Sequence, residues 1–337
     1  MNLFQTIKKP PWRTIVPGCI LLLAIVAFYH LWTPGLDVQD GRNDRKRNGI
    51  WIGHQWFAAD SWFKENGKSS QIHSYRDPQG IQNLAALLKS NHITDVFPHL
   101  CPVDAFGNLP ESDPRQIERF LDAFEGLRVM PWIGGPGPVQ ARVDDEKWRL
   151  KFISSVTNLI TEHPRLAGIH INIEPMPSGD NGFLRLEEEL RAALPKGKII
   201  SIAAYPPPIF FQRDNDIHWT EDYFRQVSER SDQMAVMMYD TGLQKPKLYQ
   251  YLMSRWTREI LDWSGNAEVL LGLPAYEDKG VDYHNPNVEN LGNALMGIHS
   301  GLAHSSSLSN YQGVAIYSEW EMNEEKWQYF ENHFLTK

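Results

Sequence analysis

Residues 169–174 carry three polar side chains that alternate with three isoleucines. The stretch reads Ile-His-Ile-Asn-Ile-Glu and is followed by Pro175. The alternation predicts a β-strand with His170, Asn172 and Glu174 on one face. A strand inside a parallel sheet is normally apolar on both faces, so a polar face that ends in a carboxylate predicts a pocket. An antiparallel strand with a solvated outer face is the plainer interpretation.

Carboxylates, an amide and aromatic rings also gather at the ends of the other predicted strands. The candidates are Trp56, Trp132, Asn172, Glu174, Tyr205, Tyr239, Asp240, Tyr276, Glu277, Glu319 and Trp320. These residue types suit glycosidic bond cleavage, which needs a general acid, a group that stabilises the anomeric carbon, and flat apolar platforms for sugar rings. His99, Asp104 and His170 share no local ligand spacing, so we expect no metal and no cofactor.

Strand-like and helix-like patterns alternate from Gly49 to the end of the chain. The predicted strands are Ile50–Gln55, Asp95–Leu100, Arg128–Ile133, Gly168–Ile173, Ile199–Ala204, Gln233–Met238, Val269–Leu273 and Val314–Ser318. The predicted helices are Pro78–Lys89, Pro114–Phe124, Asp145–Thr161, Gly182–Leu194, Glu221–Ser228, Leu248–Trp263, Val288–Ala303 and Glu324–Phe334. Eight strands, each followed by a helix, predict an α/β fold of the (β/α)8 TIM-barrel type.

A doubly wound open sheet would show the same alternation, but it usually has a glycine-rich phosphate turn after its first strand. The first strand here runs into His54-Gln55-Trp56-Phe57, which is no such turn. In a barrel the catalytic groups lie at the carboxyl ends of the strands. The polar residues at those ends are therefore expected to face one site.

An apolar run at residues 15–32 follows Lys8, Lys9 and Arg13 and is long enough to cross a bilayer. It ends in aromatic residues without a small-residue cleavage site, so we expect an uncleaved signal anchor. The resulting division is a cytoplasmic N-terminus (1–14), a transmembrane anchor (15–32), a linker (33–48) and a barrel (49–337). The barrel is expected on the extracytoplasmic side, periplasmic or extracellular, although basic residues also follow the span.

Composition limits the partners. The 337-residue chain has a formal net charge of -8, which disfavours nucleic acid as a partner. The expected partners are a polysaccharide or glycan substrate and, through the N-terminal helix, the membrane. Cys19 lies in the apolar run and Cys101 is alone beyond it, so no disulfide is expected inside the barrel. The sequence leaves the oligomeric state open.

Four strand ends together resemble the family 18 glycoside hydrolases, the chitinase-like barrels. That family's fourth strand carries Asp-Gly-x-Asp-x-Asp-x-Glu, where this chain has residues 167–174 with Glu174 in the last place. Met237-Met238-Tyr239-Asp240 is similar to the Met-x-Tyr-Asp of its sixth strand, residues 271–276 match the Leu-Gly-Leu-Pro-x-Tyr of its seventh, and residues 133–135 match the Ile-Gly-Gly of its third. Asn172, two residues before the acid, is instead similar to the amide of family 85 endo-β-N-acetylglucosaminidases.

The resemblance implies substrate-assisted hydrolysis of a β-linked N-acetylhexosamine polymer or glycan, with retention. Glu174 would be the general acid/base, and the substrate's own acetamido oxygen would attack the anomeric carbon. Asn172 would orient the acetamido group, Tyr239 would hydrogen-bond its oxygen, and Asp240 would raise the pKa of Glu174. The expected substrate-binding residues are Trp320, Tyr276, Glu319, Trp56, Trp132 and Tyr205.

Two alternatives remain open. One is a two-carboxylate retaining glycosidase in which Glu277 or Glu319 is the nucleophile, since Asn172-Ile173-Glu174-Pro175 is one residue off an Asn-Glu-Pro pattern. The other is a catalytically inactive barrel that binds carbohydrate, because Ala167, His170 and Asn172 replace the family's acids. Glu174 itself could be a structural carboxylate paired with an arginine or lysine.

Overall fold

The computed structural model of the protein describes residues 12–209 and 216–336, and the side chains of residues 12–15 and 20 are outside the description. The chain divides into two compact units, Met1–Pro34 and Gly35–Lys337, which are described here separately. The described part of the first unit, from Trp12 to Pro34, contains the helix α1 (Trp12–Leu31).

The predicted transmembrane anchor is not supported. Among residues 12–209 and 216–336, no helix is long and apolar enough to cross a membrane. Residues 15–31 belong to α1. Most of the predicted cytoplasmic N-terminus lies outside the described residues, and the extracytoplasmic location stays a prediction.

The second unit is built around one parallel sheet. Its strands are β1 (Asn48–Ile52), β2 (Ile93–Pro98), β3 (Arg128–Val129), β4 (Trp132–Pro136), β5 (Gly168–Glu174), β6 (Ile199–Ala204), β7 (Gln233–Val236), β8 (Glu268–Pro274) and β9 (Tyr311–Tyr317). Their order in the sheet is β3-β2-β1-β9-β8-β7-β6-β5-β4. All eight predicted strands are present, and the third of them is divided into β3 and β4.

The sheet closes at this division, because β3 and β4 occupy its two ends. β3 pairs with β2 and β4 pairs with β5, and an isolated parallel bridge joins His99 to Trp132. Pro131, which has no backbone N–H, lies between the two halves and accepts a hydrogen bond from the backbone N–H of His170 at 2.9 Å. The result is the predicted (β/α)8 barrel.

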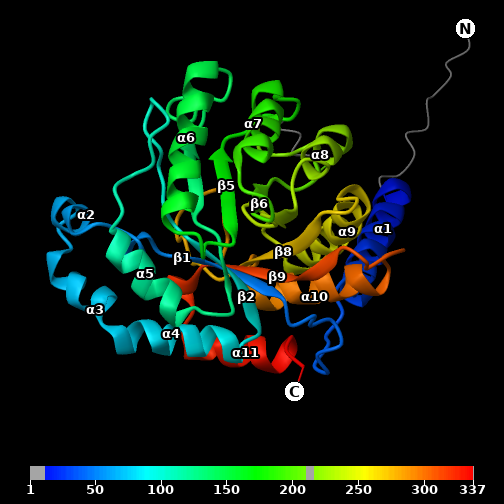
Figure 1. The fold of residues 1–337 in the computed structure, drawn as a ribbon. Coiled ribbons are helices and arrows are strands. Elements are labelled where there is room, and N and C mark those ends of the chain that lie inside the picture. The colour runs from blue at the N-terminus through cyan, green and yellow to red at the C-terminus, as the bar shows by residue number, and fades with distance from the viewer. Residues whose placement is uncertain (1–11, 210–215, 337) are drawn as a thin grey trace, which may run out of the picture. The chain divides into compact units, whose positions relative to one another are not determined.

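Each strand position is followed by a helix, as Figure 1 shows for α6, α7 and α8 beside β5 and β6. The eight predicted helices are α4 (Pro78–Ser90), α5 (Pro114–Ala123), α6 (Glu146–Glu162), α7 (Asn181–Ala193), α8 (Glu221–Ser228), α9 (Pro246–Trp263), α10 (Leu291–Ala303) and α11 (Glu324–His333). Two short helices, α2 (Asp60–Glu65) and α3 (Ile72–Arg76), lie between β1 and α4 and were not predicted.

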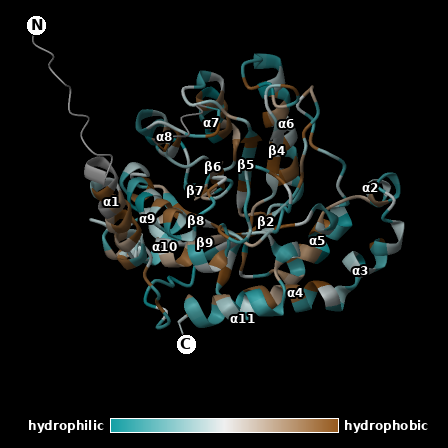
Figure 2. Ribbon diagram, turned by 180° about the vertical axis from the view of Figure 1, so that it is seen from behind, coloured by the Kyte–Doolittle hydropathy of each residue, from teal (hydrophilic) through white to brown (hydrophobic). Residues whose placement is uncertain are grey.

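The helices are amphipathic, and hydrophilic and hydrophobic residues alternate along them in Figure 2. In α5, Ile117, Phe120 and Leu121 are buried at positions i, i+3 and i+4, the spacing of one helix face. Asp113 caps the helix by accepting hydrogen bonds from the backbone N–H groups of Arg115 and Gln116. The apolar faces of such helices pack against the outside of the barrel.

The segment from residue 35 to 47, expected as part of a linker, is packed on the barrel. The backbone N–H of Leu36 donates to the carbonyl of Met296, and the hydroxyl of Tyr311 donates to the carbonyl of Asn43. Asp44 is buried and contacts His92 at 2.5 Å. The segment is polar and shows no regular spacing of apolar residues, which predicted a linker. In the structure its residues instead form hydrogen bonds and an ion pair with residues of the barrel.

A chain of buried hydrogen bonds crosses the barrel interior below the polar end of β5. The indole N–H of Trp51 donates to Nε2 of His170 at 3.0 Å, and the other nitrogen of His170 contacts Ser201 Oγ at 2.8 Å. Ser201 donates to Gln233, whose amide donates to Asp95. Burial lowers the pKa of His170 to about 3. His170 is therefore a buried, hydrogen-bonded histidine, and it supports the strand that carries Asn172 and Glu174.

Candidate active site

Glu174 is the last residue of β5, at the carboxyl end of the barrel. Its Oε1 accepts a hydrogen bond from Nδ2 of Asn172 at 2.7 Å, and its Oε2 accepts one from the hydroxyl of Tyr205 at 3.4 Å. Among the described residues Glu174 forms no ion pair with a lysine or arginine. The interpretation of Glu174 as a structural salt-bridge carboxylate therefore finds no partner in the described part of the chain.

A cavity of about 220 Å³ opens beside Glu174. Its lining residues are Glu174, Tyr205, Pro206, Ile217, His218, Met237, Tyr239, Asp240 and Tyr283. Four candidates from the sequence, which come from the ends of β5, β6 and β7, thus meet around one hollow. Their convergence follows from the parallel barrel, which places all strand ends at one face.

The environment favours the protonated form of Glu174. Solvent reaches the side chain through the cavity, yet the surrounding strand ends reduce its hydration, and this desolvation is the first cause of its raised pKa. The hydrogen bonds from Asn172 and Tyr205 act in the opposite direction, and the nearby charge of Asp240 adds to the raising. The net direction is upward, as a general acid requires.

Asn172 lies one inward-facing position before Glu174, and the residue is buried, with 6 % of its surface exposed. Its Nδ2 donates to Glu174, while its Oδ1 has no hydrogen-bond partner among the described residues. A buried amide oxygen without a partner costs stability. This oxygen is therefore a candidate acceptor for a ligand N–H.

Tyr239 and Asp240 follow β7 and face the cavity. Tyr239 stacks on Tyr317 with ring centroids 5.5 Å apart, and burial raises its pKa well above the ordinary value. Asp240 adopts a positive φ of 60° and accepts a hydrogen bond from the hydroxyl of Tyr276. Tyr276 thus reaches the site through Asp240, although it does not line the cavity itself.

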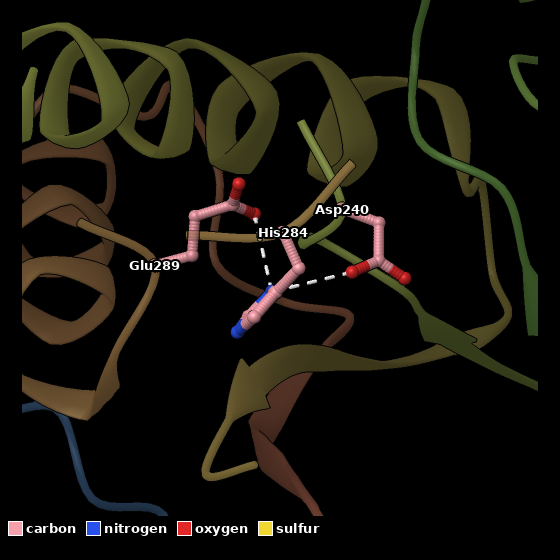
Figure 3. Close-up of side chains that lie close together, drawn as sticks. All are labelled: Asp240, His284 and Glu289. Atoms are coloured by element: carbon pink, nitrogen blue, oxygen red, sulfur yellow. Dashed lines mark ion pairs between the residues drawn. The ribbon is translucent and has the colours of Figure 1, made fainter. Parts of the chain in front are cut away.

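His284 and Glu289, which the sequence reasoning missed, join Asp240 in a compact cluster (Figure 3). His284 Nδ1 lies 3.3 Å from Oδ1 of Asp240 and 3.9 Å from Oε2 of Glu289. His284 and Glu289 lie in the long segment between β8 and α10. The only signal for them in the sequence is the presence of a histidine and an acid in a loop that follows a strand. No strand or helix periodicity points to these residues.

The ligand atoms of these three side chains lie within 4.8 Å of one another. The Glu289 carboxylate already accepts the backbone N–H groups of Thr241 and Gly242, each at 3.0 Å. Neither ring nitrogen of His284 forms a hydrogen bond with the described residues, so the contacts of Nδ1 with the two carboxylates are ion-pair contacts. The second nitrogen of a metal-bound histidine normally donates to a partner, which Nε2 lacks among the described residues. The arrangement fits an ion-pair network better than a metal site.

Tyr317, the last residue of β9, is another residue that sequence reasoning missed. Its ring contacts those of Tyr239, Tyr276 and Trp132 with centroids 5.5, 5.2 and 6.1 Å apart. Its position at the end of a strand is the sequence signal that points to it. Tyr317 therefore links the cavity side of the barrel mouth to the aromatic residues below it.

The predicted tryptophans are divided between core and rim. Trp56 and Trp132 are each 8 % exposed, so neither forms an open platform. Trp56 packs on Tyr75 with ring centroids 4.8 Å apart, and Trp132 packs against His99 at 4.4 Å. Trp320 is 48 % exposed and is the one of the three whose ring is available to a polymer.

Neither alternative nucleophile lines the cavity. Glu319 accepts hydrogen bonds from the Trp56 side chain and the backbone of Gly53, while desolvation, the largest effect, raises its pKa. Glu277 pairs with Lys279 at 3.2 Å and Lys326 at 3.3 Å, and these contacts lower its pKa. Both carboxylates are thus held by partners of their own.

A larger hollow of about 680 Å³ lies at the amino ends of the strands, at the opposite end of the barrel from the catalytic candidates. Its lining charges pair with one another: Arg128 contacts Glu268 at 2.8 Å, and Arg191 pairs with Asp232. Barrels carry their chemistry at the carboxyl ends. Size alone therefore does not make this hollow the site.

Comparison with known proteins gives the same architecture. No protein-family model and no curated protein matches the sequence. The spore cortex-lytic enzyme SleL from Bacillus cereus is similar in structure, with a TM-score of 0.56 and 10% identity over 89% of this chain and 75% of that one. A chitinase from Rhizomucor miehei has a TM-score of 0.56 and 12% identity over 85% of this chain and 99% of its own.

A fungal endo-β-N-acetylglucosaminidase from glycosyl hydrolase family 18 is also similar, with a TM-score of 0.53 and 15% identity over 85% of this chain and 95% of its own. At such identities the likeness concerns the fold. The family resemblance expected from the strand-end motifs is confirmed at that level, while the likeness to family 85 stays a prediction. The chain has the barrel fold of the family 18 glycoside hydrolases.

Proposed function

We propose that the chain is a glycoside hydrolase that cleaves a β-linked N-acetylhexosamine glycan by substrate assistance. The observation that carries the proposal is the 2.7 Å hydrogen bond from Asn172 to Glu174 at a cavity also lined by Tyr239 and Asp240. The fold likeness supports it, since the similar structures are named as chitinases, an endo-β-N-acetylglucosaminidase and a cortex-lytic enzyme.

The first half of the reaction uses Glu174 as an acid. Its proton passes to the glycosidic oxygen, and the bond between that oxygen and the anomeric carbon breaks. The acetamido oxygen of the same sugar attacks the anomeric carbon from the other face and forms a cyclic oxazolinium ion. Glu174, now a carboxylate, then takes a proton from water, which opens the ring with net retention.

Asn172 is suited to hold the acetamido group during this attack. Its unpartnered Oδ1 can accept the acetamido N–H, which increases electron density on the attacking oxygen. The hydroxyl of Tyr239 can donate to that oxygen and keep it in line. Because the Asn172 amide also donates to Glu174, one side chain would align the nucleophile and the acid together.

The sugar platforms are proposed from exposure. Trp320 at the rim and the cavity-lining Tyr205 are the expected binding residues, with Tyr276 acting through Asp240. Trp56 and Trp132 would support the site from the core. Glu319 would stabilise the segment that follows β1 at the rim of the barrel, through its hydrogen bond with Trp56.

The two-carboxylate alternative is less well supported, because Glu277 has two lysine partners and Glu319 is bonded to Trp56. A nucleophile in that mechanism must lie about 5–5.5 Å from the acid. Neither carboxylate is among the residues that line the cavity with Glu174.

The test is hydrolysis of β-linked N-acetylglucosamine oligosaccharides by the full chain, comparing the wild type with Glu174→Gln and Glu277→Gln. Loss of the general acid is expected to reduce kcat by about 10²–10⁴-fold, while Glu277→Gln keeps activity. Equal loss in both variants would favour the two-carboxylate mechanism. Tight binding without products in the wild type would favour a carbohydrate-binding barrel.

A further inference from the structure

We propose that His284 is a positioning residue which, as an imidazolium, bridges the carboxylates of Asp240 and Glu289 and thereby fixes Asp240 beside Glu174. The inference rests on the proposed function, because Asp240 acts there on the general acid. His284 and Glu289 have no counterpart among the strand-end motifs that suggested the function.

The geometry is that of one cation between two anions. In Figure 3 the imidazole of His284 lies between the two carboxylates, with Nδ1 3.3 Å from Asp240 and 3.9 Å from Glu289. The side chains of His284 and Glu289 have no exposed surface. Asp240 follows the end of β7, whereas His284 and Glu289 both lie in the segment between β8 and α10.

The charges around His284 favour a cation. The Glu289 side chain has no exposed surface, whereas that of Asp240 is 42 % exposed. A neutral imidazole would leave the buried Glu289 carboxylate without a cationic partner, and an uncompensated buried charge is costly. Burial opposes protonation of His284, but contact with Asp240 and the charge of Glu289 outweigh it, so the pKa of His284 is raised. Burial also raises the pKa of Glu289, against the backbone N–H groups and His284.

Among the described residues, Lys279 lines a hollow together with His284 but pairs with Glu277 at 3.2 Å, and the rings that face the cluster are uncharged. The ring of Tyr276 stacks on His284 with centroids 4.1 Å apart, and its hydroxyl donates to Asp240. The pKa of Tyr249 of α9 is raised, first by burial and then by the nearby charges of Glu289 and Asp240. Its hydroxyl donates to the carbonyl of Met238. Within the described residues, His284 is thus the group that can supply positive charge between the carboxylates.

The same contacts tie the β8–α10 loop to the end of β7. The backbone N–H of Gly242 donates to the carbonyl of Tyr283 at 2.8 Å, and Asn285 donates to Gln244 at 2.7 Å. Tyr283 precedes His284 and lines the catalytic cavity together with Asp240. Loss of the bridge would therefore disturb both the acid neighbour of Glu174 and the cavity wall.

The effect on catalysis passes through Glu174. The charge of Asp240 raises the pKa of Glu174, and an imidazolium beside Asp240 reduces this effect. Removing the imidazolium leaves more uncompensated negative charge near the acid. The basic limb of the pH profile, where Glu174 loses its proton, is then expected at higher pH.

The first measurement follows the histidine Cε1 protons of the full chain by NMR during a pH titration. The chain has 12 histidines, and the His284 signal is identified by its absence in His284→Gln. We expect this signal to titrate above an ordinary histidine and to move to lower pH in Glu289→Gln. A His284 that is neutral at pH 7 would overturn the inference, whether or not the chain hydrolyses glycans.

Metal analysis belongs to the same test. If the purified chain carries one equivalent of zinc that His284→Gln lacks, a metal is the cation between the carboxylates and the inference is wrong. Absence of stoichiometric metal together with the high titration of His284 supports the imidazolium.

The second measurement is the pH profile of kcat/KM for His284→Gln. We expect a roughly ten- to hundredfold lower value near neutrality, as for a misplaced active-site group, and a basic limb at higher pH. His299→Gln is the matched control, because His299 is also buried but contacts Asn43 and the carbonyl of His333 instead.

The control should lower thermal stability without moving the profile. A His284→Gln profile that keeps the wild-type limbs would show a merely structural role and overturn the inference. A wild type that hydrolyses no glycan, with His284 titrating high, would instead contradict the proposed function, and the catalytic role of His284 would fall with it.

Discussion

The amide of Asn172 donates a 2.7 Å hydrogen bond to the carboxylate of Glu174 two residues later on the same face of β5. Side chains at i and i+2 of a strand point the same way. The relation between the acid and the amide is therefore set by the strand itself rather than by a flexible loop. Gly134 of β4 pairs with Asn172 and leaves room for its backbone.

Asn172→Ala should reduce kcat by about 10²–10³-fold, the usual cost of losing one polar group that acts in the transition state. It should also raise the pKa of Glu174, because the hydrogen bond from Asn172 lowers that pKa. Steady-state kinetics across pH will measure both effects. An unchanged kcat would show that Asn172 does not orient the substrate.

Asp240→Asn should move the basic limb of kcat/KM to lower pH. The charge of Asp240 raises the pKa of Glu174, so its removal lets the acid lose its proton earlier as the pH rises. The variant is opposite in sign to His284→Gln, which leaves Asp240 charged. A limb that stays in place would mean that Asp240 and Glu174 are not coupled.

Gly134→Ala should destabilise the barrel strongly and disturb the Asn172–Glu174 pair. A Cβ at this position would lie 1.9 Å from the backbone oxygen of Asn172, and its φ of +137° strains any L side chain. Gly197→Ala is the matched control, since its φ is +88° with no atom within 4 Å. The free energy of unfolding of Gly197→Ala should fall by only about 1–2 kcal/mol, the cost of placing an L residue at a positive φ.

Thermal unfolding will compare the two glycine variants. If Gly197→Ala loses as much stability as Gly134→Ala, the close approach of β4 to Asn172 has no energetic weight.

Glu187→Gln should stabilise the protein more at pH 8 than at pH 5. Glu187 of α7 is fully buried, neither carboxylate oxygen has a hydrogen-bond partner in the described structure, and burial raises its pKa well above 4.5. The free energy of unfolding is therefore not reduced by Glu187 below the pKa of a glutamate in the unfolded chain. It falls as the pH rises from there toward the higher pKa of Glu187 in the folded protein. The glutamine removes this loss.

Melting temperatures at the two pH values will measure the gain, with Glu188→Gln as the neighbouring control. Glu188 is exposed and pairs with Arg230 at 2.8 Å, so its loss should change little at either pH. Equal gains for Glu187→Gln at both pH values would contradict a protonated Glu187.

The barrel could be predicted because its strands are short, apolar and regularly followed by amphipathic helices. The eight strand positions lie within a few residues of the predicted ones. The division at Pro131 and the short helices α2 and α3 were not predicted. An interruption of one strand near a single proline is too local to change the pattern of apolar residues. Helices of five or six residues are likewise too short to show a periodic pattern.

At the site, most residues at strand ends were predicted, although Tyr317 at the end of β9 was missed, and the loop residues His284 and Glu289 were not predicted. Strand alternation located Asn172 and Glu174, and the ends of β6 and β7 located Tyr205, Tyr239 and Asp240. His284 and Glu289 lie in a long loop whose path is set by tertiary contacts, such as the hydrogen bond between Gly242 and Tyr283. Burial of Trp56 and Trp132 likewise depends on packing that the sequence pattern does not specify.

The most direct test of substrate assistance uses paired oligosaccharides that differ only in carrying a 2-acetamido or a 2-hydroxyl group. We predict that the full chain hydrolyses only the acetamido series and that Glu174→Gln reduces kcat for this series by about 10²–10⁴-fold. Comparable hydrolysis of the hydroxyl series would contradict the account, because no acetamido oxygen would then be available to attack the anomeric carbon.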